Sequence, residues 1–350
     1  MPQLFDNCGA GRHQRNGTSS HQIKQERFVV EAKFGARSTT DEVLAEIDLK
    51  GKRIVVTGVS SGLGVETSRA LVARGATVIA TARDLAKADA ALQDAREEAS
   101  LSGGSLELLA LDLASFDSVR SFTDMLVSRG EKLDIIISNA GVMAPPFGRT
   151  QDGIETQFAV NHLAPFLLVN RLASLLNPGG RVVVVASSGH RSADVELSDP
   201  NFDHTPYDSW VGYGRSKTAA ILFAVEFDQR HKAEGIRAVA VHPGGIATNL
   251  ARHMSPDAFE PMMAQVNEAH AKAGLPPFQL KSIPQGAATS VWAAVAADAN
   301  IVGGQYCEDC NVATIRDEPD MLGGVRSYAI DLRRAQALWA KSEEMVAEQF

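Results

Sequence analysis

The sequence predicts an α/β fold, a single-domain Rossmann-type doubly wound parallel sheet. Apolar segments that are almost continuously hydrophobic alternate with segments of helical period, which is typical of a parallel sheet covered by helices on both faces. The first apolar segment, at 54–56, leads into the glycine-rich stretch TGVSSGLG at 57–64 and then into a helical pattern. A strand, a glycine-rich turn and a helix in this order are typical of a site for dinucleotide phosphates.

The glycine-rich turn has the spacing T-G-x-x-x-G-x-G, and each glycine has a role in a phosphate site. Gly58 permits a tight turn, Gly62 lets the backbone approach a pyrophosphate, and Gly64 allows close packing of the helix on the strand. The helix N-terminus offers free N–H groups and the positive end of its dipole to the anion. The predicted cofactor contacts of the turn are Gly58, Ser60, Ser61, Gly62, Leu63 and Gly64.

Strand and helix patterns alternate from about residue 40 to the C-terminus. Thr39 and Glu42 have capping-box spacing, so a short helix is expected to begin there. Strands are expected at 52–58, 76–82, 106–113, 133–141, 180–187, 236–245 and 303–308. Helices are expected from the glycine turn to residue 75, after the second strand to about residue 99, at 115–128, 154–176 and 212–234, after Pro284, and at 330–346.

Residues 1–40 differ in composition from the predicted domain at 41–350. They are rich in Gly, Asn, Gln, Ser and His, a composition that buries too little apolar surface to offset the entropy of ordering. A disordered tail is therefore expected, although a start codon assigned too far upstream explains the composition equally well. Asp6, Glu26 and Glu31 and the lack of a clear amphipathic stripe argue against a transit peptide, and no signal-peptide core is visible.

Charge and cysteine content restrict the class of protein. The 350 residues carry a formal net charge of -8, which argues against broad attraction to nucleic acid or to anionic membranes. No apolar run approaches the ~20 residues of a membrane span. Cys8, Cys307 and Cys310 form no disulfide framework, so a reducing, cytoplasmic location fits best. Cys307 and Cys310 have metal-site spacing, but zinc normally needs four ligands and no second cysteine pair exists, so no metal site is predicted.

The end of the second strand bears on the choice of cofactor, because ligands of such sheets bind beyond the carboxyl ends of the strands. Ala82 lies where an NAD-binding sheet carries an acidic residue for the ribose 2′-hydroxyl, and Arg83 follows. An arginine here can accommodate the 2′-phosphate of NADP, or it can be a solvated arginine at a strand end. NADP is the predicted cofactor. NAD remains the alternative, because Asp84 could pair with Arg83 and because the glycine turn has no basic residue.

Two further strands end in residues that are small or polar. Such residues let a nucleotide lie across the sheet edge, although ordinary loop capping explains each equally well. The predicted cofactor contacts at these strand ends are Asp112, Leu113, Asn139, Ala140 and Gly141.

The fifth strand ends in Ser187, and the next helix carries Tyr213 and Lys217. These two residues are four apart and hence lie on one helix face. A phenol pKa of ~10 is too high for a base at neutral pH, and a nearby ammonium group can lower it. A Ser187 hydroxyl could hold a carbonyl oxygen in place. The combination of an acid or base, a tuning cation and a polarising donor is that of a site for hydride transfer, although the spacing Y-x-x-x-K by itself is common by chance. His190 and His242 border this site.

The order of these motifs resembles the classical short-chain dehydrogenase/reductase family, from about residue 40 to the C-terminus. The matching residues are TGVSSGLG, Asp112, NAG at 139–141, Asn161 in FAVNHLAPF, Ser187, Tyr213, Lys217 and HPGGIATNL at 242–250. YGRSKTAAILFAVEF and GHRSADVELSDPNFD look like the subgroup of retinol dehydrogenases, WW-domain oxidoreductases and their bacterial relatives. Two positions depart from the family pattern: Ala186 replaces a frequent serine, and the glycine turn lacks the basic residue of many NADP-preferring members.

The resemblance implies a role for each catalytic candidate. Tyr213 would be the general acid/base, and Lys217 would hold the nicotinamide ribose and lower the tyrosine pKa. Ser187 would polarise the substrate carbonyl, and Asn161 would order a water that relays protons through Lys217. Asp112 would lie near the adenine. The residues implied for the loop that holds the carboxamide of nicotinamide are Pro243, Gly244, Ile246 and Thr248.

The expected activity is interconversion of an alcohol and its carbonyl compound by an NAD(P)(H)-dependent oxidoreductase. Reduction of a carbon–carbon double bond, as in the protochlorophyllide reductases that the subgroup resembles, is one alternative. A dinucleotide-binding regulatory protein without turnover is the other. Residues 189–210 and the mobile-looking segment 249–283, with Met262 and Met263, are expected to determine the small-molecule substrate. The Tyr213 helix often forms dimer contacts in the family, so the prediction includes a possible homodimer.

Overall fold

The structure is a computed structural model that describes residues 33–248, 250 and 256–350. The chain from Phe34 to Phe350 forms one compact unit. The predicted tail therefore lies largely outside the described residues and stays a prediction. Residues 33–40 do lie within them, and Phe34 packs against the apolar core. Thr39 caps the first helix through the predicted capping box with Glu42.

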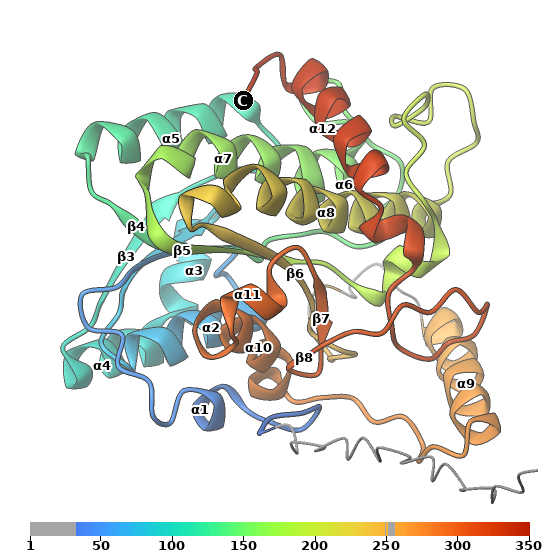
Figure 1. Cartoon of the computed structure of the whole chain (residues 1–350), viewed down its shortest axis with the longest axis horizontal. Coiled ribbons are helices and arrows are strands. Elements are labelled where there is room, and N and C mark those ends of the chain that lie inside the picture. The colour runs from blue at the N-terminus through green and yellow to red at the C-terminus, as the bar shows by residue number, and fades with distance from the viewer. Residues whose placement is uncertain (1–32, 249, 251–255) are drawn as a thin grey trace, which may run out of the picture. The chain divides into compact units, whose positions relative to one another are not determined.

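The described residues form an eight-stranded sheet in the order β3-β2-β1-β4-β5-β6-β7-β8 (Figure 1). The strands are β1 (Arg53–Thr57), β2 (Thr77–Ala82), β3 (Ser105–Ala110), β4 (Leu133–Ser138), β5 (Leu176–Val185), β6 (Arg237–His242), β7 (Tyr306–Glu308) and β8 (Asn311–Val312). The first seven are parallel and β8 is antiparallel to β7. The predicted doubly wound parallel sheet is confirmed, and its strand order reverses between β1 and β4, where such sheets bind ligands.

Helices cover both faces of the sheet (Figure 1). On one face lie α5 (Phe116–Arg129), α7 (Ala164–Leu172) and α8 (Ser209–His231), with α12 (Leu332–Val346) packed on α8. On the other lie α2 (Leu63–Val72), α4 (Gln93–Ser102) and α10 (Ile283–Val291). The shorter helices are α1 (Thr40–Val43), α3 (Leu85–Ala91), α6 (Thr156–Phe158) and α11 (Ala299–Val302).

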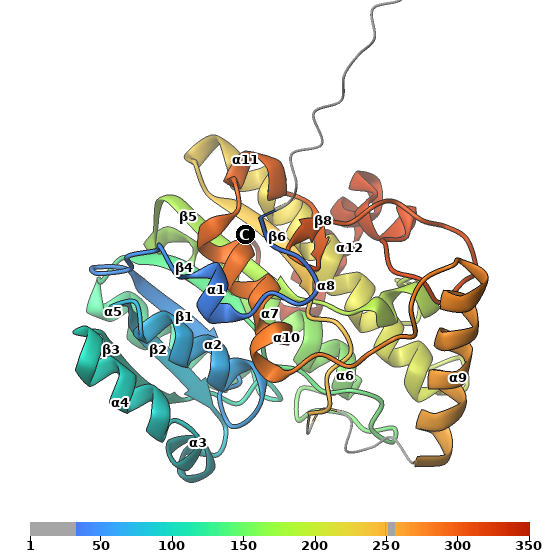
Figure 2. The same cartoon turned by 90° about the horizontal axis from the view of Figure 1, so that it is seen from below.

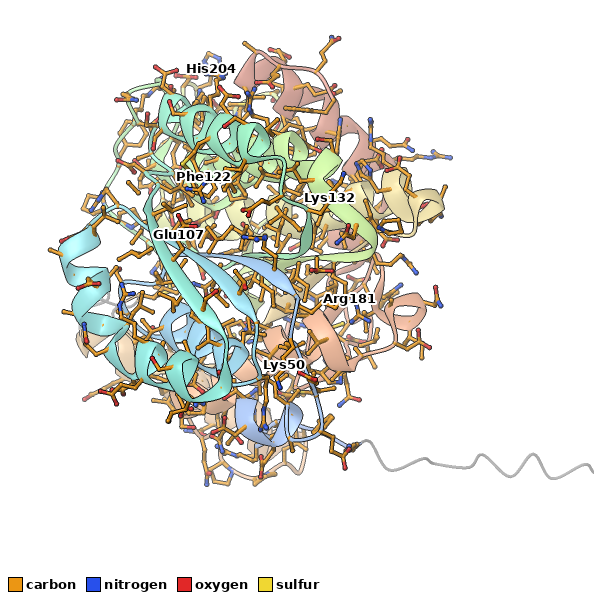
Figure 3. The ribbon with its side chains drawn as sticks, turned by 90° about the vertical axis from the view of Figure 1, so that its left-hand side faces the viewer. Lys50, Glu107, Phe122, Lys132, Arg181 and His204 are labelled. Atoms are coloured by element: carbon orange, nitrogen blue, oxygen red, sulfur yellow. The ribbon has the colours of Figure 1, made fainter. Side chains whose placement is uncertain are left out.

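Alternate strand residues supply two separate cores, because successive side chains of a strand point to opposite faces. In β1, Val55 belongs to the core under α5, α7 and α8, whereas Ile54 and Val56 belong to the core on the α2 side. The strands are apolar on both faces and therefore read as continuous hydrophobic runs. Figure 3 looks onto the β3 edge of the sheet, where Glu107 lies on the strand and the buried Phe122 lies on the α5 side.

Several predicted element boundaries were wrong. The helix expected at 154–176 is α6, a π-helical turn at Ala159–Leu163, α7 and a 3-10 turn at Ala173–Leu175. The helix expected after the second strand is two helices, α3 and α4, separated at Leu92. The two-residue strand β8 was not predicted; it follows a turn in which Asp309 and Cys310 have positive φ. The spacing of Cys307 and Cys310 is thus that of a tight hairpin.

The segment 249–283 contains a helix that the sequence did not predict, α9 (Pro256–Lys272). Residue 249 and residues 251–255 lie outside the described residues. Pro261 lies inside α9, and a proline within a helical pattern usually indicates its end. α9 lies apart from the other helices at the right-hand edge of Figures 1 and 2.

Candidate active site

The glycine turn joins β1 to α2 and is packed against the end of β4. Gly58 has φ +76°, and a Cβ there would lie 2.7 Å from the Cα of Ala140. A Cβ on Gly64 would lie 2.3 Å from the carbonyl oxygen of Gly58 and 2.6 Å from Nδ2 of Asn139. Real Cβ atoms do not approach so closely. Both positions therefore require glycine, Gly58 for its backbone conformation as well as its contacts and Gly64 for the close approach alone.

The N-terminus of α2 is left open for an anion. Gly62 is its N-cap residue, with φ +64°, and no side chain caps the first turn. A Cβ at Gly62 would meet only Thr248, at 3.5 Å, so the loop after β6 lies over the turn. Ser60 and Ser61 line a cavity beside the turn together with Lys87. Free N–H groups at a helix N-terminus and a closely approachable backbone fit the pyrophosphate of a dinucleotide.

Asn139 holds the turn in place. Its Nδ2 donates to the carbonyls of Thr57 at 2.8 Å and Gly58 at 3.2 Å. The backbone N–H groups of Asn139 and Ala140 both donate to Oγ1 of Thr57 at 3.0 Å. The Asn139 side chain thus supports the glycine turn from within the protein, a role that the sequence did not predict for it.

The end of β2 has no acidic group beside the expected ribose position. Ala82 is buried, and Arg83 is exposed. Asp84 is the N-cap of α3 and its carboxylate accepts from the N–H of Lys87 at 3.0 Å. Among the residues that the structure describes, Arg83 forms no ion pair and no side-chain hydrogen bond. The predicted competition of Asp84 for Arg83 is therefore replaced by a capping role.

The end of β3 places Asp112 and Leu113 along the same edge of the sheet. Oδ1 of Asp112 accepts from the N–H of Ala114 at 3.0 Å, and Leu113 is buried. The N–H of Asp112 donates to Oγ of Ser118 at 3.0 Å, which holds the short loop against the start of α5.

Ser187 and Tyr213 lie together beyond the carboxyl end of β5. Oγ of Ser187 accepts from the N–H of Gly189 at 3.0 Å and interacts with the Tyr213 phenol. A Cβ on Gly189 would lie 2.6 Å from the Tyr213 ring, so the ring packs directly on this backbone. Trp210 lies edge-on to Tyr213 with ring centroids 6.2 Å apart. The predicted Ser187 and Tyr213 are thus brought together, whereas Ser188 is exposed.

Lys217 lies one helical turn after Tyr213 and is almost fully buried. Its Nζ donates to the carbonyl of Val185 at 2.8 Å and lies 5.9 Å from the centroid of the Tyr213 ring. Burial lowers the pKa of Lys217 to about 8. Burial also raises the pKa of Tyr213 to about 12, against a smaller lowering by Ser187. The expected lowering of the tyrosine pKa by Lys217 is therefore not found in the protein alone, and Tyr213 carries its proton at neutral pH.

Asn161 lies in the π-helical turn between α6 and α7. Its Oδ1 accepts from the N–H of Val142 at 2.8 Å, and its Nδ2 donates to the Val142 carbonyl and to Oγ of Ser216, both at 2.9 Å. A Cβ on Gly141 would meet Oδ1 of Asn161 at 3.0 Å and Nζ of Lys217 at 3.5 Å, so the three groups meet. Pro165 has no N–H to donate to the Asn161 carbonyl four residues earlier, which explains a π-turn here.

The loop after β6 carries the remaining predicted residues, Pro243, Gly244, Ile246 and Thr248. Lys281 was not among the predicted residues. Its aliphatic chain lies 2.8 Å from the Cβ position of Gly244, and its Nζ pairs with Asp309 at 2.6 Å. Ile246 forms a bridge with Lys281. These contacts hold the loop over the sheet edge, and no local pattern marks Lys281.

His190 is a second residue for which the sequence predicted a place beside the site but no role. It is fully buried, and its ring contacts Ser187 and the backbone of Arg326. The only sequence signal is its place three residues after Ser187.

Comparisons with known proteins identify the family. The family model described as short chain dehydrogenase matches residues 52–258. A probable oxidoreductase of Streptomyces lividans is 41% identical over 84% of this chain and 97% of that protein. Retinol dehydrogenase 14 of Mus musculus is 37% identical over 85% of this chain and 86% of that protein.

Solved structures share the fold. A putative uncharacterised protein from Mycobacterium paratuberculosis is 32% identical and has a TM-score of 0.66 over 90% of this chain and 99% of that one. The angucycline C-6 ketoreductase LanV, solved with bound NADP, is 26% identical with a TM-score of 0.57 over 75% of this chain and 95% of that one. In the part of the chain that the structure describes, no helix combines the length and apolar character needed to cross a bilayer. On its sequence, its sheet and these relatives, the chain belongs to the short-chain dehydrogenase/reductase family of oxidoreductases.

Proposed function

We propose that this chain is an NADP(H)-preferring oxidoreductase that interconverts an alcohol and its carbonyl compound in the cytoplasm. The observation that carries the proposal is the meeting of three groups at the carboxyl end of β5. These are the Ser187 hydroxyl, the protonated Tyr213 phenol and the buried Lys217 ammonium. NADP(H) would supply or accept the hydride when bound.

The hydrogen bonds of the site support a distinct role for each side chain. Ser187 Oγ accepts from the Gly189 N–H and interacts with the Tyr213 phenol, so a carbonyl oxygen that approaches Tyr213 would also meet the Ser187 O–H. Tyr213 holds a proton at neutral pH, since its pKa is about 12, and can deliver it to the same oxygen. One N–H of the Lys217 ammonium donates to the Val185 carbonyl, which leaves two N–H donors for ribose hydroxyls. Asn161 is held by Val142 and Ser216, and its side chain and the Lys217 ammonium both lie beside Gly141.

Replacement of the proton donor tests the proposed chemistry. Tyr213→Phe should retain the fold and NADPH binding and lose about a hundred- to ten-thousandfold in kcat, because a missing acid/base group removes 10²–10⁴-fold. The measurement is NADPH oxidation with a panel of aldehydes, ketones and quinones, alongside NADPH binding by fluorescence. A Tyr213→Phe enzyme with wild-type kcat on any carbonyl that the wild type reduces would exclude this mechanism.

The surroundings of Arg83 support the NADP preference. No carboxylate occupies the Ala82 position to repel a 2′-phosphate, and Asp84 is engaged in capping α3. Arg83 offers a planar fork of donors suited to phosphate. Ser60 and Ser61 add neutral hydrogen-bonding groups beside Lys87. The bound NADP of the LanV ketoreductase is consistent with this assignment.

Two features of the chain bear on assembly and location. α12 packs on α8, the helix that carries Tyr213, so a homodimer would have to form through another surface or displace α12. Cys307 and Cys310 are buried free thiols, as a reducing cytoplasm allows.

The substrate panel also distinguishes the alternatives: activity confined to activated carbon–carbon double bonds would favour double-bond reduction, and NADPH binding without any turnover would favour a regulatory protein.

A further inference from the structure

His190 connects the candidate catalytic serine to a distant part of the chain. Nδ1 of its imidazole lies 2.7 Å from the carbonyl oxygen of Ser187, and Nε2 accepts from the backbone N–H of Arg326 at 3.2 Å. The carbonyl oxygen can only accept, so Nδ1 must carry the hydrogen, and Nε2 must present its lone pair. Only the neutral imidazole protonated on Nδ1 satisfies both partners. The two contacts therefore define the tautomer as well as the position of the ring.

The imidazole restrains Ser187 at its backbone. The Ser187 carbonyl accepts from the His190 N–H at 3.1 Å as well as from the ring, so one residue supplies two donors to one oxygen. Ser187 is also the N-cap of the 3-10 turn Ser188–Ser192. The orientation of its hydroxyl thus depends on a peptide group that His190 holds.

The backbone of His190 is held from two other elements. Its carbonyl accepts from the Tyr328 hydroxyl at 2.6 Å and from Oγ1 of Thr218 at 3.2 Å. Thr218 directly follows Lys217 on α8, and Tyr328 lies in a 3-10 turn, Ser327–Ile330, before α12. His190 is fully buried between them.

The neighbouring Arg191 anchors residues 313–330, which we call the C-terminal segment. Its side chain is 8% exposed and forms an ion pair with Asp320 at 3.1 Å. Its guanidinium also donates to the carbonyls of Gly323 at 2.8 Å and Gly324 at 3.4 Å. Adjacent residues behind Ser187 thus bind the C-terminal segment, one through its ring and the other through its guanidinium.

We propose that His190 is a positioning residue that couples the C-terminal segment to the orientation of Ser187. Catalysis would then depend on a backbone N–H, that of Arg326, which lies well over a hundred residues after Ser187. The inference rests on the proposed role of Ser187 but concerns residues outside the catalytic set.

Variants of His190 separate its two hydrogen bonds. In His190→Asn the amide Nδ2 can still donate to the Ser187 carbonyl, whereas the acceptor for Arg326 is lost; in His190→Phe both are lost. We expect kcat to fall about tenfold or more in His190→Phe, and about three- to tenfold in His190→Asn, which loses only the bond to Arg326, with KM for NADPH within about twofold of wild type in both. His231→Asn, at a partly exposed histidine at the C-terminal end of α8, serves as the control. A wild-type kcat in His190→Phe would overturn the proposal.

A matched pair at Arg326 removes the remote partner without touching the core. Arg326 has φ −71°, which proline adopts, and Val325 before it is in a β-bridge, as a residue preceding proline prefers. Arg326→Pro deletes the N–H that reaches His190, whereas Arg326→Ala keeps it and removes only the guanidinium. We expect kcat of Arg326→Pro to be about three- to tenfold below that of Arg326→Ala, and equal values would contradict the coupling.

The assays use the aldehyde, ketone or quinone that the wild type reduces fastest, well below the melting temperature of each variant. Tyr213→Phe is measured in parallel. An inactive Tyr213→Phe beside fully active His190→Phe and Arg326→Pro would reject the positioning role alone. Full activity in all three would reject the positioning role and the proposed chemistry together. This comparison also keeps the test valid where His190→Phe folds poorly, because the Arg326 pair leaves the buried ring unchanged.

Discussion

Adjacent residues at the end of β5 have different surroundings, and this difference assigns their roles. The Ser187 hydroxyl lies against Gly189 and Tyr213. Ser188 is exposed, and its backbone N–H donates to Nδ1 of His242 at 3.3 Å. The predicted register, with Ser187 as the first residue past Ala186, places the hydroxyl at the phenol. The catalytic assignment itself stays a prediction.

Ser187→Ala should therefore reduce kcat far more than Ser188→Ala. Loss of a donor to the developing oxyanion costs about 10²–10³-fold in kcat, whereas an exposed hydroxyl outside the site should change it by less than about twofold. Steady-state kinetics on one carbonyl substrate, with both variants at equal folded fraction, provide the measurement. The reverse ranking would show that the register is off by one residue.

Arg83 should control the cofactor preference. Charge-assisted hydrogen bonds contribute roughly 1.5–3 kcal/mol, which corresponds to about ten- to a hundredfold. We expect wild type to prefer NADPH over NADH in the lower half of this range. Arg83→Ala should level the preference, and Ala82→Asp should invert it by repelling the 2′-phosphate. The ratio of kcat/KM for the two cofactors is the measurement; a wild-type preference for NADH, or an Arg83→Ala enzyme that still favours NADPH tenfold, would contradict the assignment.

At the scale of elements, α12 completes the core on the α8 side of the sheet. Trp339 is 2% exposed and packs on Phe166 and Phe223, with ring centroids 4.9 and 6.1 Å away. The Arg230 guanidinium lies 4.1 Å from its ring centroid. The C-terminal helix of the chain thus covers an apolar face of α8.

Trp339→Ala should lower the free energy of unfolding by about 3–5 kcal/mol, the usual cost of deleting a buried large aromatic side chain. Leu101→Ala, at a side chain that is 86% exposed, should change it by less than about 0.5 kcal/mol. Urea unfolding at neutral pH gives both values. Equal stabilities of the two variants would mean that α12 adds little to the core, and light scattering of Trp339→Ala would report any association through exposed α8.

At the scale of the whole molecule, buried neutral histidines link stability to pH. Burial lowers the pKa of His162 to about 3 and of His190 to about 4. His162 is enclosed by Phe158 and Phe166, and within the described residues its Nδ1 has no hydrogen-bond partner. Protonation of these rings in the folded state is therefore opposed.

Stability should decrease as pH falls below 6.5. In that range the unfolded chain binds protons that the native protein does not, so each such histidine costs about 1.4 kcal/mol per pH unit until its native pKa is reached. Above pH 6.5 the effect is absent. The test is urea unfolding of wild type and His162→Leu at several pH values between 7 and 5. The variant should show a shallower decrease, and identical slopes would indicate that His162 is protonated in the native state.

The sequence alone was sufficient for the fold class and for most strand ends. Continuous apolar runs, helical periods and glycine spacing are local properties, so β1–β7 and the glycine turn could be located from them. The candidate residues after β1, β2, β4 and β5 followed from the rule that parallel strands present their carboxyl ends at one edge. Tyr213 and Lys217 are one helical turn apart, and the order of the motifs around them, which resembles the family, marked them as candidates.

Only the tertiary structure revealed which of these groups depend on distant partners. The Asn139 contact with Thr57, the coverage of α8 by α12 and the bond between His190 and Arg326 all join segments more than 80 residues apart in sequence. Such contacts leave no periodic pattern, because each residue satisfies its own local element whatever lies across from it. The pKa of Tyr213 is likewise raised by burial, which depends on the whole packed core and leaves no local sequence pattern.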